Sequence, residues 1–546
     1  MLLRSGARRL LHDGQRQLVS QRSNRSLHGS HSFHSFKWRM GTLGIGLGSC
    51  AISLGAIATV YADAETESIA PLGDLLRSYF VYSMCSVPTL VNWSPAILET
   101  CASVPGVREA SQAFIRRTFF AQFVGGDTCD DTLPLIASLR KQNKGTLLAY
   151  SVEVDETRGG RADQWKKNVE EMIASVEFAA NFEDTQKGSR KTWVAIKLSA
   201  LVPSADSLKR MSKFLVKSRP KDDVPFPGTP GSFDMVVFRG AKYPLIEGGL
   251  TEEDIASLRT LYEDLRTVCK RAKERGIRLI FDAEHTWYQP GIDAFVLALS
   301  REFNKPSSSD RFNEQPLVYA TYQAYLRRTP AHLARSIQDA RNFGYLLGVK
   351  LVRGAYYDQE TAEHHDSGAP GYPVWTEKPQ TDACYNTCAK LLINELAKYY
   401  SQSGPQGIAR GDWAEKTLHT STHTGIGILF GTHNALSCAH ILENLVDAGL
   451  ASRTTEDRVV LKDKVEERLC FGQLYGMRDD LTDWMVQTVE AKSPMVLKYV
   501  PYGALADVMP YLARRAIENR SVLGGEGGAT MERRMVGQKI RKRLFG

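Results

Sequence analysis

The stretch LVYATYQAYLRRTPAHLARSIQDARNFGYLLGVKLVRGAYY, residues 317–357, holds two short β-rich runs on either side of a helical spacer. Strands that alternate with helical spacers predict parallel β-α-β units. Outward from this stretch the rhythm repeats, and eight such runs predict a closed (β/α)8 barrel. An open doubly wound sheet is the alternative, but the GxGxxG turn after its first strand is missing. The eight runs span 146–154, 193–201, 278–285, 317–326, 347–357, 427–434, 468–477 and 496–503.

This rhythm also sets the domain boundaries. It predicts a barrel over 146–525, preceded by a helical region over 63–145 and followed by a basic tail over 526–546, outside the barrel. The spacer at 202–245 contains several Pro and Gly residues and a run of charges. We therefore expect a partly flexible insertion between the second and third strands.

The positive charge of the chain is concentrated at its N-terminus. Residues 1–40 hold eight Lys/Arg against one acid, Asp13, which is a net +7 out of the chain's +8. The remainder is close to neutral, which argues against nucleic-acid binding because that function needs a basic patch on the folded domain. An Arg-rich, Ser-rich and acid-poor N-terminus is typical of a mitochondrial transit peptide, with a disordered basic tail as the alternative.

An uncharged apolar segment follows. Residues 41–61, GTLGIGLGSCAISLGAIATVY, match the roughly 20 residues that are needed to cross a bilayer. Gly and Ala make the segment only moderately hydrophobic, so spanning the membrane, lying on it and belonging to the presequence stay open. We expect residues 41–62 to form a membrane-associated segment.

The nine cysteines are scattered, and only Cys384 and Cys388 lie close together, at a helical i,i+4 spacing. A zinc site would need two such pairs or nearby histidines. The pattern predicts free thiols in a reducing compartment and no metal site.

Polar residues end most of the predicted strands, where barrels of this kind hold their chemistry. Lys197 lies inside the apolar run VAIKLSAL. An inward lysine needs a carboxylate or a charged ligand, whereas an outward one extends to solvent. Asp282 ends the next strand and offers such a partner. The other strand ends carry Glu153, Glu156, Glu284, His285, Gln323, Lys350, Arg353, Tyr356, Thr432, His433, Asn434, Gln473 and Tyr499.

The helix predicted after the eighth strand carries Tyr511, Arg514, Arg515 and Glu518 in the sequence PYLARRAIENR. Their i, i+3, i+4 and i+7 spacing places all four on one face. Two adjacent arginines can grip a carboxylate with paired hydrogen bonds. A solvated charged face, with Glu518 pairing internally, explains the same spacing, so both interpretations stay open at this point.

Five motifs, FDAEH, QAYLRR, KLVRGAYY, THN and YLARRAIEN, closely resemble those of the proline dehydrogenases, FAD enzymes also called proline oxidases. The resemblance implies a (β/α)8 barrel with FAD at its C-terminal face. It implies oxidation of L-proline to Δ1-pyrroline-5-carboxylate by hydride transfer to FAD, with electrons passed to ubiquinone in the inner mitochondrial membrane. We expect a monofunctional eukaryotic type, without the aldehyde dehydrogenase domain of the bifunctional bacterial members.

The same resemblance assigns substrate and catalytic residues. It implies that Lys197 and Asp282 are the active-site lysine and aspartate, and that Arg514 and Arg515 bind the carboxylate of proline. Either Glu153 or Glu156 is expected to pair with an active-site arginine. The residues implied to enclose the substrate ring are Leu351, Tyr356, Tyr499 and Tyr511.

For the cofactor, the resemblance implies that Ala283 touches the flavin and that Gln323 hydrogen-bonds its edge. Lys350 stands where bacterial members have an arginine near the flavin N5, and we count it among the catalytic residues. The substitution keeps the positive charge but loses the fork geometry. Arg353, Gly354 and Ala355 are implied to contact the pyrophosphate. Thr432, His433 and Asn434 are implied to contact the adenosine.

Tyr499 also bears on substrate choice, because the related hydroxyproline dehydrogenases carry a smaller residue there. A tyrosine favours proline, and hydroxyproline is the rival substrate. Two other classes compete: a Schiff-base aldolase with Lys197 as the amine, and a non-catalytic membrane scaffold that has kept the barrel. A yellow purified protein would count against the aldolase.

Overall fold

The computed structural model describes residues 71–87, 89, 103–151, 164–220, 223–238, 246, 248–306, 315–367, 372–402, 425–521 and 528–545. Residues 63–546 form one compact unit. The predicted transit peptide, the apolar segment 41–62, Glu153 and Glu156 lie outside the described residues.

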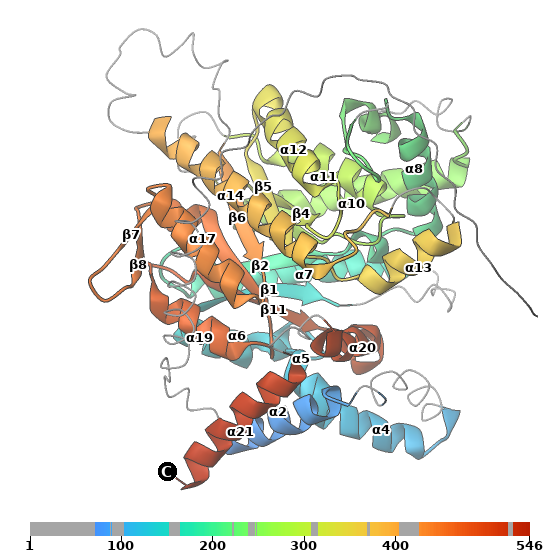
Figure 1. The fold of residues 1–546 in the computed structure, drawn as a ribbon. Coiled ribbons are helices and arrows are strands. Elements are labelled where there is room, and N and C mark those ends of the chain that lie inside the picture. Colours follow the sequence, from blue (N-terminus) through green and yellow to red (C-terminus); the bar gives the residue numbers. More distant parts are fainter. Residues whose placement is uncertain are drawn as a thin grey trace, which may run out of the picture. The chain divides into compact units, whose positions relative to one another are not determined.

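Eight parallel strands close into a barrel, which confirms the predicted fold class (Figure 1). The order around the barrel is β1-β11-β9-β6-β5-β4-β3-β2. Each predicted run overlaps one strand, but several extend too far because the polar residues at the carboxyl ends belong to loops. The strands are β1 (Lys144–Tyr150), β2 (Thr192–Ile196), β3 (Leu279–Phe281), β4 (Val318–Gln323), β5 (Leu347–Val352), β6 (Ile426–Gly431), β9 (Leu469–Leu474) and β11 (Val496–Tyr502).

Helices connect the strands, as the β-α-β rhythm predicts. They are α7 (Gln164–Asp184), α8 (Ala205–Ser218), α10 (Glu252–Arg275), α11 (Gln289–Phe303), α12 (Thr329–Phe343), α13 (Tyr357–Ser367), α14 (Lys378–Gln402), α17 (Ala435–Asp447), α18 (Val465–Arg468), α19 (Asp479–Thr488) and α20 (Leu505–Ser521). Short 3-10 turns occur at η2 (Asp130–Thr132), η3 (Leu198–Ala200) and η4 (Ser232–Phe238). A small additional sheet combines β7 (Ala451–Arg453), β8 (Val459–Leu461) and β10 (Val489–Glu490).

The segment predicted as an insertion contains packed structure. Within 202–245, α8 buries Leu208, Met211 and Leu215 in the same core as α10 and α11. The next helix, α10, begins with a capping box, in which Thr251 and Asp254 each bind the backbone N–H of the other. Such caps satisfy N–H groups that the first helical turn leaves unpaired. These elements anchor the connection between β2 and β3.

The barrel interior is filled by side chains from alternate positions of its strands. Leu147, Trp193, Ile280, Leu429 and Leu497 belong to this interior cluster, together with Tyr319, whose ring centroid lies 5.2 Å from that of Trp193. Gly427 faces them, since a Cβ atom there would lie 2.3 Å from the Tyr319 hydroxyl. The interior is therefore a packed core, as is usual for this fold. The intervening positions face the surrounding helices.

The N-terminal helical region is described from residue 71 and contains α2 (Leu72–Cys85), α4 (Val107–Ile115), the π-helix η1 (Arg116–Phe120), α5 (Ala121–Phe123) and α6 (Leu133–Lys141). The predicted basic tail contains a helix, α21 (Ala529–Phe545), which packs beside α2 (Figure 1). A cluster that includes Val81, Phe123, Val508 and Ala529 joins these helices to α20.

The described cysteines, seven of the nine in the chain, are buried free thiols. Within the described ranges, no helix is both long and apolar enough to cross a bilayer.

Candidate active site

Alternation along the strands directs several polar side chains into the mouth of the barrel. Ala195 and Ile280 belong to the interior cluster. Lys197 and Asp282 lie two residues further along and therefore share that inward face. The backbone N–H of Asp282 donates to the carbonyl of Ile196 over 2.9 Å, so Lys197 and Asp282 occupy neighbouring positions at the strand ends. The expected pairing of these two side chains stays a prediction.

The Asp282 carboxylate binds two donors from strands that are not neighbours of β3. Lys350 Nζ, on β5, donates to Oδ1 over 2.5 Å, and the Tyr499 hydroxyl, on β11, donates to Oδ2 over 3.0 Å. Lys350 Nζ also lies 5.2 Å from the centroid of the Tyr499 ring. Burial, followed by the charge of Asp282, raises the pKa of the Tyr499 hydroxyl well above its ordinary value. Tyr499 therefore remains a proton donor to the carboxylate.

The loop after β3 holds this arrangement in place through Glu284, a buried carboxylate. Its Oε1 accepts the backbone N–H of Ser199 over 2.9 Å, and its Oε2 binds the Ser199 hydroxyl. Gln323 Nε2 donates to the Glu284 carbonyl over 3.3 Å. Glu284 thus ties the turn η3, which begins directly after Lys197, to the chain around Asp282 and Ala283.

Leu351 follows Lys350 near the carboxyl end of β5, and its expected place in the substrate pocket stays a prediction. It is fully buried and in register with Tyr322 on β4. Leu474 is an inward-facing apolar residue at the mouth, because it ends β9 in register with Tyr499.

The last barrel helix places its two arginines in different surroundings. The Arg514 guanidinium lies 5.3 Å from the ring centroid of Tyr356, which follows β5. Arg515 is only 4% exposed and donates to Glu518 Oε1 over 2.5 Å. Its guanidinium also lies 4.8 Å from the ring centroid of Tyr511. Glu518 does pair internally, as one sequence interpretation expected, but Arg515 is buried and Glu518 is partly buried, so the pair is not a solvated one.

Two aromatic rings support Tyr356: His285, which was among the polar strand ends in the sequence, and Trp287, which the sequence did not single out. The His285 ring lies between Tyr356, with centroids 4.0 Å apart, and Trp287, which stacks at 4.2 Å. Glu360, on α13, accepts both the backbone N–H and the hydroxyl of Thr286 and lies 3.8 Å from His285 Nδ1. This stack fixes the ring against which Arg514 lies.

A second cluster surrounds Arg353, which follows β5. Its guanidinium donates to Asp382 over 2.7 Å, to the Thr432 hydroxyl over 2.7 Å and to the Ser437 hydroxyl over 2.8 Å. The ring of Tyr385 lies 4.4 Å from it. Asp382 and Tyr385 come from α14, and neither was predicted. In the sequence, both residues are indistinguishable from the polar residues of a solvent-exposed helix face. Only the fold brings them to Arg353.

The Arg353 cluster lies at the N-terminus of α17. Asn434 caps this helix, since its side-chain oxygen accepts the backbone N–H of Ser437 over 2.9 Å. A helix N-terminus and a guanidinium together attract an anion such as a phosphate. Gly354 follows with φ +134°, and a Cβ atom there would lie 2.4 Å from the Tyr325 ring, so glycine is required. Ala355 continues this loop.

His433 supplies a polar atom that fits a ligand. Its Nε2 accepts the backbone N–H of Leu474 over 3.0 Å, which leaves the proton on Nδ1. That Nδ1 atom is buried and has no hydrogen-bond partner among the described residues. Burial, followed by the charges of Lys498 and Arg478, lowers the pKa of His433 well below its ordinary value. His433, one of the predicted adenosine contacts, therefore offers a neutral N–H donor at Nδ1.

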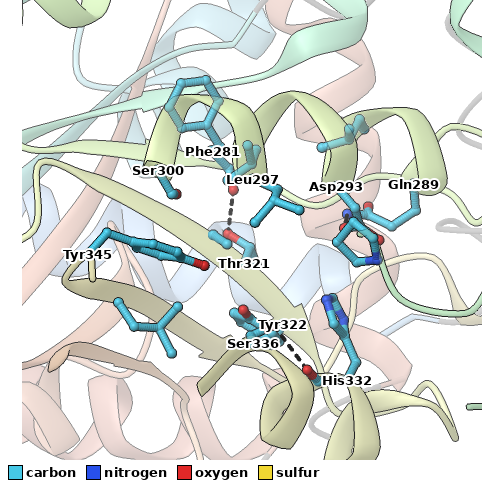
Figure 2. Close-up of a pocket in the computed structure, with 15 residues that line it drawn as sticks. Phe281, Gln289, Asp293, Leu297, Ser300, Thr321, Tyr322, His332, Ser336 and Tyr345 are labelled. Carbon is cyan, nitrogen blue, oxygen red and sulfur yellow. Dashed lines mark hydrogen bonds between the residues drawn. The ribbon is translucent and has the colours of Figure 1, made fainter. Parts of the chain in front are cut away.

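A separate small pocket lies on the outer side of β4, between α11 and α12 (Figure 2). Its cavity is about 30 Å³ and holds little more than one water molecule. Asp293 in its wall pairs with Arg328 over 2.6 Å, and burial lowers the pKa of His332 to about 3. This pocket lies within the barrel wall, and the candidate catalytic side chains lie at the mouth.

A parallel barrel with acidic, basic and phenolic side chains gathered at the carboxyl ends of its strands belongs to the (β/α)8-barrel enzymes. The profile of the family described as proline dehydrogenase matches residues 132–525. The match covers more than half of the chain, so the chain belongs to the proline dehydrogenase family and is an enzyme of that family.

Two similar curated proteins illustrate the range of the family. Hydroxyproline dehydrogenase of Mus musculus is 27% identical, over 89% of this chain and 94% of that protein. Mitochondrial proline dehydrogenase 2 of Arabidopsis thaliana is 29% identical, over 88% of this chain and 90% of that protein. Among solved structures, proline utilization A of Bdellovibrio bacteriovorus matches with a TM-score of 0.60 and 17% identity, over 92% of this chain and 43% of that protein. The last comparison supports the fold alone.

Proposed function

We propose that this enzyme oxidises L-proline to Δ1-pyrroline-5-carboxylate with bound FAD. The observation that carries the proposal is the Asp282 cluster at the barrel mouth, with Lys350 and Tyr499 bound to one carboxylate. It lies in a chain that matches the proline dehydrogenase profile. FAD supplies the chemistry when bound, since it accepts a hydride from C5 of proline.

Arg514 and Arg515 bind the proline carboxylate in this proposal. Leu351, Tyr356, Tyr499 and Tyr511 enclose the ring, and Leu474 adds a further apolar contact. Arg515 is held by Glu518 and Arg514 lies against Tyr356, so both cations are positioned before the substrate arrives. Such pre-positioning reduces the entropy that is lost when the substrate is aligned for reaction.

The Asp282 cluster sets the protonation state of the substrate nitrogen in this proposal. The substrate nitrogen must be neutral before a hydride can leave C5. Tyr499 holds its proton at Oη, and Lys350 Nζ lies against the Asp282 carboxylate. With Lys197 as a neighbour, the Asp282 carboxylate is the group of this cluster that receives the ammonium proton. Lys197, Asp282 and Lys350 are therefore the proposed catalytic residues.

The residues present fit FAD. Arg353, Thr432 and the N-terminus of α17 suit its diphosphate, and the unpartnered His433 Nδ1 suits a polar atom of the adenosine. The remaining contacts carried over from the family resemblance are Ala283, Gln323 and Lys350 at the flavin ring, Gly354 and Ala355 at the diphosphate, and Asn434 at the adenosine.

The absorbance spectrum of the purified protein tests this proposal directly. A flavin band that bleaches when proline is added, without other additives, is the expected result. A colourless protein that neither binds FAD nor consumes proline would overturn it. Loss of the band only with another amino acid would keep the cofactor and change the substrate.

Hydroxyproline is the second candidate substrate, because several similar animal proteins carry the name hydroxyproline dehydrogenase. Tyr499 decides between the two substrates in our proposal, since its ring occupies space that a ring hydroxyl would need. We predict that Tyr499→Ser lowers kcat/KM for proline about tenfold or more, because it removes a donor to Asp282. It should also raise the ratio of kcat/KM for hydroxyproline to kcat/KM for proline, because the smaller side chain leaves space for the ring hydroxyl. Steady-state kinetics with both substrates check this, and an unchanged ratio would contradict the assignment.

We further propose that the enzyme works in the mitochondrion and reduces ubiquinone. It lies in the inner membrane or on the matrix side of that membrane. The N-terminal composition and the mitochondrial Arabidopsis relatives support this location. Proline-dependent reduction of a short-chain ubiquinone, followed by its absorbance, tests the acceptor. Electron transfer to soluble dyes but to no quinone would contradict it.

A further inference from the structure

Helix α2 presents an apolar stripe to the outside of the molecule. Leu76, Tyr79 and Phe80 lie at i, i+3 and i+4 and are 51%, 42% and 44% exposed. Phe114, on α4, is 43% exposed and contacts Phe80 edge-to-face, with ring centroids 6.0 Å apart. Large apolar side chains gathered on one exposed face indicate an interaction site.

Helix α21 lies along this stripe and adds positive charge. A Cβ atom at Gly537 would lie 3.2 Å from the Tyr79 ring, so this side of α21 faces α2. Arg534 and Arg541 are three residues before and four residues after Gly537, and both are exposed. Their spacing places them on the same side of the helix as Gly537. Leu544, seven residues after Gly537, is 52% exposed on the same side.

The charge of α21 is predominantly positive. The helix carries six basic residues, and its one acidic residue, Glu532, is buried. We define the α2–α21 surface as Leu76, Tyr79, Phe80, Phe114, Arg534 and Arg541. It combines apolar and aromatic groups with cations at their edge, which is the composition of a membrane-interface surface.

We propose that the α2–α21 surface docks on an anionic lipid bilayer. Aromatic and aliphatic groups enter the headgroup region, while the arginines bind lipid phosphates. A second copy of this chain is a poorer occupant, because a two-fold contact through this surface would gather the arginines of both copies in one interface, where like charges repel. Cations of one sign along a helix suit an extended anionic surface.

The proposal rests on the proposed membrane location and specifies how the enzyme body meets the bilayer. The predicted apolar segment ends at residue 61, and α2 begins at Leu72. The residues between them span at most about 35 Å even when fully extended. A bilayer that holds residues 41–61 therefore lies within reach of α2.

Hydrogen exchange with mass-spectrometric readout tests the surface in the full-length, FAD-loaded enzyme. Peptides from α2 and α21 should exchange more slowly when vesicles of phosphatidylcholine with phosphatidylglycerol are added. Vesicles of phosphatidylcholine alone should give little protection. Peptides from α8 should exchange equally in both conditions and serve as the internal reference.

Paired variants give the matched control. Arg534→Glu with Arg541→Glu should weaken binding to the anionic vesicles by about tenfold or more, since each basic residue near such a surface contributes on the order of 1 kcal/mol. Lys213→Glu with Lys217→Glu, at exposed i,i+4 positions of α8, should leave the binding of the surface unchanged. Dye-linked proline oxidation should be unchanged in both.

Three outcomes would overturn the proposal. Vesicle binding without protection of α2 and α21 would place the contact elsewhere, for example in residues 1–62, and leave the proposed location intact. Protection that appears without lipid and grows with protein concentration would identify a second copy as the occupant. No vesicle binding by the full chain would remove both the surface and the proposed membrane location.

Discussion

Asp282 draws together residues that are far apart around the barrel. Its neighbours in the sheet are β2 and β4, yet its carboxylate is bound from β5 and β11. These bonds cross the mouth, so the chemistry of the site depends on closure of the barrel. The charges of Asp282 and Lys350 largely compensate each other, which leaves Arg514 and Arg515 as the attraction for a carboxylate.

Arg515 gives the sharpest test of the substrate grip. We predict that Arg515→Met raises the KM for proline about tenfold or more, because it removes a charge-assisted hydrogen bond to the carboxylate. The affinity for FAD should change far less. Kinetics and flavin titration on the same preparation separate the two effects, and an unchanged KM would remove Arg515 from the carboxylate site.

Asp382 is a positioning residue for Arg353. We predict that Asp382→Asn weakens FAD binding about tenfold, because the Arg353 guanidinium loses the ionic partner that orients it. The control is Lys378→Met, which removes the other ion pair of Asp382 and leaves Arg353 bound. Flavin fluorescence measures the dissociation constant without turnover. Equal effects of both variants would argue against the positioning role.

At the scale of elements, α21 reaches back to the proposed FAD side of the barrel. Glu532 Oε1 lies 3.4 Å from Arg478 Nε, and Arg478 donates to the His433 carbonyl over 3.1 Å. Asp480 already binds Arg478. Burial, followed by the charge of Asp480, raises the pKa of Glu532 from 4.5 to about 8.

This raised pKa predicts a pH dependence of stability. Between about pH 4.5 and 8 the folded chain keeps a proton that the unfolded chain has released, so stability falls as the pH rises through this window. Glu532→Gln cannot release that proton, and its melting temperature should decrease less between pH 5 and 8. Parallel thermal melts of the two proteins check the prediction, and parallel slopes would contradict it.

The elements themselves were largely predictable, and the contacts between them were not. Periodicity found eight strands because buried parallel strands are nearly continuous apolar runs. It could not fix the side that Leu351 faces, since one residue along a strand reverses the side that a side chain faces. Asp382, Tyr385 and Glu360 were missed because polar residues on helices give no sign of burial in the sequence. The family motifs supplied Arg353 and Thr432, and the structure brings them together.

At the scale of the whole molecule, residues 63–546 form one compact unit that contains every described residue of the candidate site. We predict that deleting residues 1–62 leaves proline oxidation with a soluble dye acceptor essentially intact. Specific activity per bound flavin is the measurement. Complete loss of activity with normal expression would show that the deleted residues belong to the fold.

The contact of Glu532 with Arg478 has a consequence for synthesis of the protein. A ribosome synthesises α21 after all eight barrel strands, so the support that runs from Glu532 through Arg478 to His433 is incomplete until α21 has emerged. A message cut short before codon 529 would yield a barrel with all eight strands and an unsupported His433. Synthesis of α21 is therefore a condition for a finished candidate cofactor site.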